Sequence, residues 1–131
     1  MIPRPTKVGK LAMGFQVSTR ALGRVVVVDA VGRLTLSDSR TRLRDLIHVF
    51  CGNGHKQFLL NLAGVDFIDS DGMGELVRCY SVVRQRGGEM KLVQVSKKVQ
   101  ELLQITRLAT LFEIYGEELA ALQTFSATTP E

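Results

Sequence analysis

The chain has 131 residues, of which 45% are apolar and 23% charged, a composition typical of one ordinary globular domain. No apolar run approaches the ~18 residues that a membrane-spanning helix requires. Residues 1–10 contain basic residues and prolines but lack the apolar core of a signal peptide. These features exclude a membrane span and a secretory leader, and they predict a cytoplasmic protein.

The net charge of +4 is unevenly distributed along the chain. Residues 1–56 carry ten Lys and Arg against three Asp and Glu, whereas residues 57–131 carry seven against ten. The basic residues of the first half stand singly, without interleaved aromatic residues. This pattern favours a solvated surface, or one that meets acidic partner surfaces, over direct binding of nucleic acid.

The cysteines and histidines show no spacing that predicts a redox or metal site. Cys51 and Cys79 are isolated, so we expect buried or half-buried free thiols. His48 and His55 have no Cys cluster or His-Glu-x-x-His pattern nearby. The sequence therefore predicts no metal and no cofactor.

The first half of the chain predicts two strands and a helix after a flexible N-terminal lead at residues 1–12. Residues 15–19 suit a short edge strand. The continuous β-branched run at 24–31 predicts a strand that is covered on both faces and broken by Gly32. A helix is expected to begin near residues 37–39 and to end at 52–54. Its apolar stripe has the spacing i, i+3, i+4, i+7 and comprises Leu43, Leu46, Ile47 and Phe50.

The second half predicts strands that alternate with helices. Buried strands are expected at 57–62 and 90–95, and a further strand at 111–115. The helix expected at 70–86 has an apolar stripe of Met73, Leu76, Val77, Tyr80 and Val83, while Glu75, Arg78, Ser81 and Gln85 are expected to face water or a partner. Ser96 is expected to cap a helix, and Glu117 and Glu118 suit the first turn of the last one. Residues 13–125 thus form one domain, followed by a tail at 126–131.

This alternation predicts an α/β fold with a mostly parallel sheet of four to five strands and right-handed crossovers. The chemistry of interest lies where the strand at 57–62 leads into the next helix. Asp69 and Ser70 precede Gly72 and Gly74, so a serine hydroxyl is set at a helix N-terminus. Unpaired amide groups and the helix dipole favour negative charge there.

Ser70 has two interpretations at this turn. It is either an ordinary N-cap, worth ~1 kcal/mol, or a phosphoacceptor at a position that tolerates added negative charge. Asp69 suits a capping carboxylate, and nothing in the sequence supplies the rest of a hydrolytic triad. Gly72 and Gly74 suit close approach of another backbone or tight helix–strand packing, and no phosphate-loop motif occurs. The sequence thus predicts no enzyme.

The order of segments resembles the STAS-domain anti-sigma factor antagonists from about Phe15 to Leu122. Asp69-Ser70-Asp71-Gly72-Met73-Gly74 is similar to the family's Asp-Ser-Ser/Thr-Gly-Leu/Met-Gly turn. Upstream, Gly32-Arg33-Leu34 is similar to its Gly-x-Leu segment. Downstream, the glycine pair at 87–88, the helix at 96–103 and the segment at 108–115 follow in the family's order.

The resemblance implies a STAS-like fold with about four helices mainly on one face of the sheet. It also implies an anti-sigma factor antagonist that binds an anti-sigma factor, itself a serine kinase, and so regulates sigma-dependent transcription. The kinase phosphorylates Ser70 and breaks the complex, and a phosphatase resets the switch. The implied partner-binding residues are Gly32, Arg33, Leu34, Asp69, Asp71, Gly72, Met73, Gly74, Glu75 and Arg78, with no catalytic residue.

Asp71 departs from the Ser or Thr that the family usually has at this position. Its carboxylate places permanent negative charge on the docking face, which weakens a partner's grip or disfavours a second negative group on Ser70. The competing functional hypothesis is a non-phosphorylated STAS scaffold or adaptor, a subunit of a signalling or transport assembly that uses the same surface without phosphate.

Overall fold

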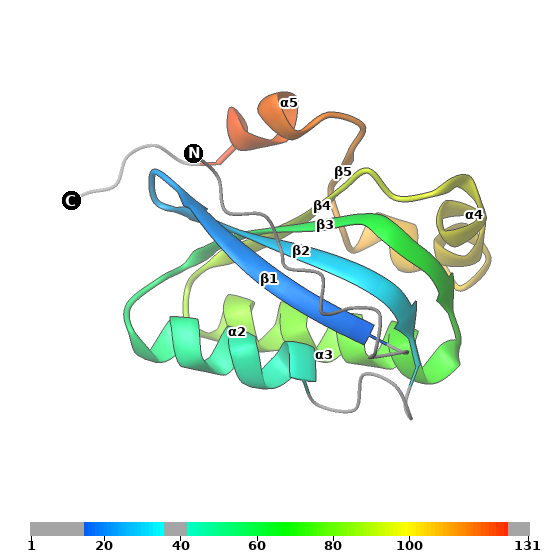
Figure 1. Ribbon diagram of the computed structural model, residues 1–131, viewed down its shortest axis with the longest axis horizontal. Coiled ribbons are helices and arrows are strands. Elements are labelled where there is room, and N and C mark those ends of the chain that lie inside the picture. Colours follow the sequence, from blue (N-terminus) through cyan, green and yellow to red (C-terminus); the bar gives the residue numbers. More distant parts are fainter. Residues whose placement is uncertain (1–14, 36–41, 126–131) are drawn as a thin grey trace.

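The computed structural model describes residues 15–35 and 42–125, which form a five-stranded sheet with helices on both faces (Figure 1). The elements in chain order are β1 (Phe15–Leu22), β2 (Val25–Leu34), α2 (Arg42–Gly52), β3 (Gln57–Ile68), α3 (Ser70–Gln85), β4 (Glu89–Val93), α4 (Lys97–Ile105), the 3-10 helix η2 (Leu108–Thr110), β5 (Ile114–Tyr115) and α5 (Glu118–Leu122).

The strands lie side by side in chain order, β1-β2-β3-β4-β5. Only β1 and β2 are antiparallel, because the turn at Gly23 and Arg24 joins them directly as a hairpin. Every later pair is parallel and is joined through a helix. This confirms the predicted mostly parallel α/β sheet, including the edge strand at its N-terminal end.

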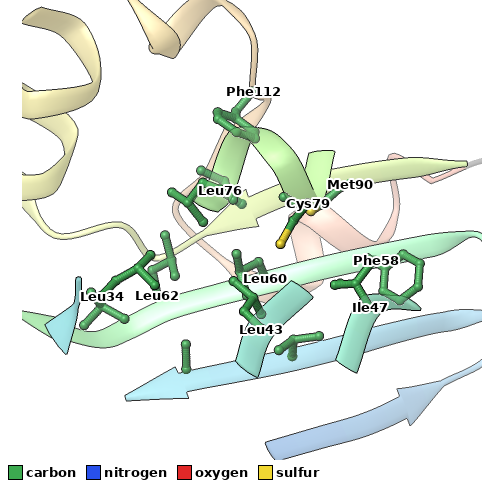
Figure 2. Close-up of a cluster of buried hydrophobic side chains, with 14 of the residues drawn as sticks. Leu34, Leu43, Ile47, Phe58, Leu60, Leu62, Leu76, Cys79, Met90 and Phe112 are labelled. Carbon is green, nitrogen blue, oxygen red and sulfur yellow. The ribbon is translucent and has the colours of Figure 1, made fainter. Parts of the chain in front are cut away.

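The main core lies between the sheet and the helices α2, α3 and α4 (Figures 1 and 2). Alternate side chains of β2 and β3 point into it, and it also contains Leu43 and Ile47 of α2 and Leu76 and Cys79 of α3. The labelled members in Figure 2 are Leu34, Leu43, Ile47, Phe58, Leu60, Leu62, Leu76, Cys79, Met90 and Phe112. The helices therefore lie mainly on one face, as predicted.

A smaller core covers part of the opposite face beneath α5 (Figure 1). Val25, Val27 and Leu59 pack there with Ala121 and Phe125. Burial on both faces explains why β2 reads as a continuous apolar run rather than as an alternating pattern. Polar contacts also hold this region: the Arg20 guanidinium on β1 pairs with Glu118 at 2.8 Å, and Lys91 Nζ donates to the Thr124 carbonyl oxygen at 3.0 Å.

Several predicted boundaries were wrong. Gly32 does not end β2, because its positive φ of 112° accompanies a bulge and the strand continues to Leu34. β3 runs to Ile68, six residues beyond the expected end. The strand expected at 111–115 is reduced to β5, because Phe112 turns into the core and packs edge-on against Tyr80. The predicted helix start at 37–39, the lead at 1–12 and the tail at 126–131 lie outside the described residues.

Candidate functional site

The predicted turn lies where β2 and β3 end side by side and α3 begins. Leu34 pairs with Ile68 in the parallel register, and the Asp69 amide then donates to the Leu34 carbonyl oxygen at 3.4 Å. Open α/β sheets commonly bind their partners at this carboxyl edge. The structure thus brings Gly32–Leu34, the last residues of β2, next to the turn 69–74.

Asp69, not Ser70, is the N-cap of α3. Its backbone is extended, with φ −108° and ψ −175°, and its Oδ1 accepts a hydrogen bond from the Gly72 amide at 2.8 Å. Ser70 is therefore the first helical residue, which corrects the interpretation of its hydroxyl as a capping group. The Ser70 side chain is exposed and has no hydrogen bond to any of the described residues.

Gly72 is required by the close approach of α3 to the end of β2. A Cβ built on Gly72 would overlap the Leu34 carbonyl oxygen, which is a backbone atom. Leu34 is completely buried, and Met73 is 4% exposed and packs in the main core. Among the predicted partner-binding residues, Leu34, Gly72 and Met73 are therefore buried beneath the turn. They hold it in place and present no side chain to a partner.

The prediction that Glu75 faces water or a partner was wrong. Glu75 is only 4% exposed, and its carboxylate meets Arg44 Nε of α2 at 3.4 Å. An unpaired buried carboxylate would be costly, so the arginine on the neighbouring helix allows the acid to lie in the α2–α3 contact. Arg44 could not be identified from the sequence, because a contact between two helices leaves no trace in the residue spacing along either helix.

Arg78 lies on the exposed side of α3 and its guanidinium covers Gly74. Arg78 Nη1 is 3.1 Å from the position that a Gly74 Cβ would occupy. Gly74 therefore differs from Gly72: its missing side chain makes room for a flexible cation and not for a neighbouring backbone. The expectation of tight helix–strand packing holds at Gly72 alone.

The segment Gly32–Leu34 adds an exposed cation beside the turn. Arg33 is exposed, and its guanidinium carbon lies 5.6 Å from the ring centroid of Phe67 on β3. Phe67 is itself 45% exposed. Phe67 could not be identified from the sequence, because its exposed place near the end of β3 follows from that strand's extension beyond Leu62.

The two thiols take no part in this site. Both are buried, as predicted, and burial raises the pKa of each, so neither is a reactive thiolate at neutral pH. Within 15–35 and 42–125, no group of three His, Cys, Asp or Glu residues is arranged to hold a metal ion. No helix in that same part of the chain is long and apolar enough to cross a membrane.

The site is thus an exposed hydroxyl and carboxylate, Ser70 and Asp71, at the positive end of a 16-residue helix. Unpaired amides and the helix dipole make this position favourable for an added anion. The guanidinium of Arg78 lies one turn further along the same helix. Such an arrangement can bind a partner or accept a phosphate, and it contains no nucleophile paired with a base.

Comparison with known proteins identifies the family. The family described as "STAS domain" matches residues 16–121. The anti-sigma F factor antagonist of Paenibacillus polymyxa is 34% identical over 67 residues, covering 51% of this chain. The anti-sigma-B factor antagonist of Bacillus subtilis is 31% identical over 62 residues, covering 47% of it. Each alignment spans 57% of the relative's own length.

Solved structures show the same fold. An anti-sigma factor antagonist from Mycobacterium paratuberculosis superposes with a TM-score of 0.75 at 19% identity, covering 86% of this chain and 94% of that one. The Bacillus protein SpoIIAA in its phosphorylated form has a TM-score of 0.64 at 20% identity, covering 84% and 97%. STAS-domain anti-sigma antagonists are non-enzymatic regulators. The chain belongs to the STAS-domain family, and its homologues are named anti-sigma factor antagonists.

Proposed function

We propose that this protein is an anti-sigma factor antagonist that binds an anti-sigma factor with serine kinase activity and is released when Ser70 is phosphorylated. A phosphatase then restores the binding form. In this cycle the protein regulates sigma-dependent transcription as a binding partner and a kinase substrate.

The observation that carries the proposal is the division of roles between Asp69 and Ser70. Because Asp69 Oδ1 caps the Gly72 amide, the Ser70 hydroxyl is not needed to hold the helix start. It projects from an exposed position and can enter a kinase active site without unfolding α3. A serine that served as the N-cap would have to give up its hydrogen bond to react.

A phosphate at this position is compatible with the fold and changes the surface strongly. It adds about −1.5 to −2 charges at a helix N-terminus, where the dipole favours them. Asp71 is exposed next to it, so the modified turn concentrates negative charge on the face that docks. Repulsion of an acidic group on the partner, or steric loss of a close contact, then breaks the complex.

In this proposal the contact surface consists of the phosphoacceptor Ser70 and the exposed members of the predicted partner-binding set. Those members are Arg33, Asp71 and Arg78, and the Arg78 guanidinium lies over Gly74. Glu75 supports the surface through Arg44 and does not contact the partner. The position of the turn relative to β2 is fixed by Leu34, Asp69, Gly72 and Met73. The bulge at Gly32 sets the position of Arg33.

The test is phosphorylation by the anti-sigma kinases encoded in the same genome. Each purified kinase is incubated with ATP and the full chain, and the product is analysed by intact mass and peptide sequencing. We expect one phosphate, located on Ser70, and loss of the stable complex after modification. Ser70→Ala should remove the label, whereas Ser81→Ala, an exposed serine on the same helix, should keep it.

The alternative function gives a different result in the same experiment. A non-phosphorylated scaffold or adaptor would form a stable complex that survives ATP, with no phosphate added to either variant. A phosphate located on Ser81 or Ser96 would contradict the assignment of Ser70.

A further inference from the structure

Arg78 lies where it can bind a phosphate on Ser70 from the same helix. Ser70, Gly74 and Arg78 are spaced at i, i+4 and i+8, so they lie along one side of α3. Helical side chains lean toward the N-terminus, and the Arg78 guanidinium accordingly lies over Gly74. It therefore occupies the place of an i+4 side chain relative to Ser70.

The spacing matches that of an ordinary ion pair on a helix surface. One turn separates Ser70 from Gly74, a rise of about 5.4–6 Å, and pairs at this separation interact directly. The order is also the favourable one, because the anion stands N-terminal to the cation and at the positive end of the dipole. Without a side chain, Gly74 leaves the path between the two groups open.

The guanidinium is also available for this role. No carboxylate of the described residues forms an ion pair with Arg78, and Glu75, one turn before it, is engaged by Arg44 of α2. Asp71 is a second carboxylate near Gly74, and it does not form an ion pair with Arg78 either. A phosphoserine side chain is longer than an aspartate, carries about twice its charge and offers three acceptor oxygens, which a guanidinium can bind through two N–H groups.

We infer that Arg78 is an intramolecular ligand for the phosphate on Ser70. When the serine is modified, the Arg78 guanidinium binds the phosphate and is no longer available to the partner. The inference rests on the proposed phosphorylation of Ser70. It adds a second element to the switch: phosphorylation introduces negative charge and at the same time withdraws a cation from the surface offered to the partner. Because Gly74 has no side chain, the Arg78 guanidinium has only a short distance to move to reach the phosphate.

The experiment places phosphoserine at position 70 during translation, so that no kinase is needed. The second pKa of the phosphate is then followed by ³¹P NMR in the full chain and in Arg78→Gln. We expect the wild-type pKa to be lower than that of Arg78→Gln by about half a pH unit, because a nearby cation favours the dianion. The background from Asp69, Asp71 and the helix dipole is the same in both proteins.

Arg84→Gln is the matched control. Arg84 is an exposed arginine on the same helix whose Nη1 donates to the Gly88 carbonyl oxygen at 3.3 Å, away from the turn. It should leave the phosphate pKa unchanged. Arg78→Lys, which keeps the charge but loses the two-pronged donor, should give an intermediate value. Far-ultraviolet circular dichroism checks that every variant is folded.

Equal phosphate pKa values in the wild type and Arg78→Gln would overturn the inference, as would equal effects of Arg78→Gln and Arg84→Gln. These outcomes are independent of whether any kinase modifies Ser70, which the preceding experiment decides. A failure here with Ser70 phosphorylated by its kinase would leave the proposed function intact and remove only the role of Arg78.

Discussion

The two glycines of the turn should respond in opposite directions to the same substitution. In Gly72→Ala the new methyl group overlaps the Leu34 carbonyl oxygen and lies 3.1 Å from Leu34 Cγ. Leu34 cannot give way, because it is fully buried and its carbonyl accepts from the Asp69 amide. Overpacking of this kind costs about 1–3 kcal/mol or more. In Gly74→Ala the methyl group meets only the flexible end of Arg78.

The magnitudes follow from these contacts. Replacing a helical glycine by alanine gains about 0.5–1 kcal/mol when the space is open, because the unfolded chain loses freedom. Gly74→Ala should therefore raise the free energy of unfolding by that amount. Gly72→Ala should lower it by about 2 kcal/mol, which shifts the melting temperature down by roughly 6–10 °C in a domain of this size.

Urea unfolding followed by circular dichroism measures both variants against the wild type. The m-value shows whether the transition stays two-state, which the comparison requires. A Gly72→Ala protein as stable as the wild type would refute the close approach between α3 and β2. A loss in Gly74→Ala as large as that in Gly72→Ala would refute the distinction between a backbone neighbour and a side-chain neighbour.

Three further predictions concern the charged and polar groups of the turn. Asp69→Ala should lower the free energy of unfolding by about 1 kcal/mol through loss of the cap, whereas Ser70→Ala should change it by less than ~0.5 kcal/mol, as thermal melts will show; equal losses would contradict the capping role of Asp69. Glu75→Ala should cost about 1–3 kcal/mol, and a double-mutant cycle with Arg44→Ala should give a coupling energy clearly above zero; purely additive effects would mean that the pair contributes nothing. Asp71→Ser should tighten the complex with the anti-sigma partner by about 1 kcal/mol, which is roughly a fivefold lower Kd in titration calorimetry. Weaker binding by the mutant, with a difference from the wild type that shrinks in high salt, would instead make Asp71 an attractive contact.

The sequence alone determined the features that arise from local patterns. The apolar periodicity of α3 and the cap at Ser96, whose Oγ accepts from the Val99 amide at 3.2 Å, lie where they were predicted. The β-branched run at 24–31 forms the larger part of β2, although the strand continues beyond it. Each depends on residues within one or two turns of the chain, so the pattern and the structure report the same interactions. The location of the turn at the carboxyl edge of the sheet follows from the alternation of strands and helices.

Only the tertiary structure decided which residues of the turn face a partner. A glutamate at position 75 is expected on the surface, and its burial depends on its ion pair with Arg44, 31 residues earlier in the chain. Gly72 and Gly74 look alike in the sequence, yet one meets the backbone of β2 and the other the side chain of Arg78. The sequence already favoured Asp69 as a capping carboxylate, but the capping role it also allowed for Ser70 was excluded only by the structure. Contacts between segments distant in the chain fix the roles of Glu75, Gly72 and Gly74, and no local pattern encodes them.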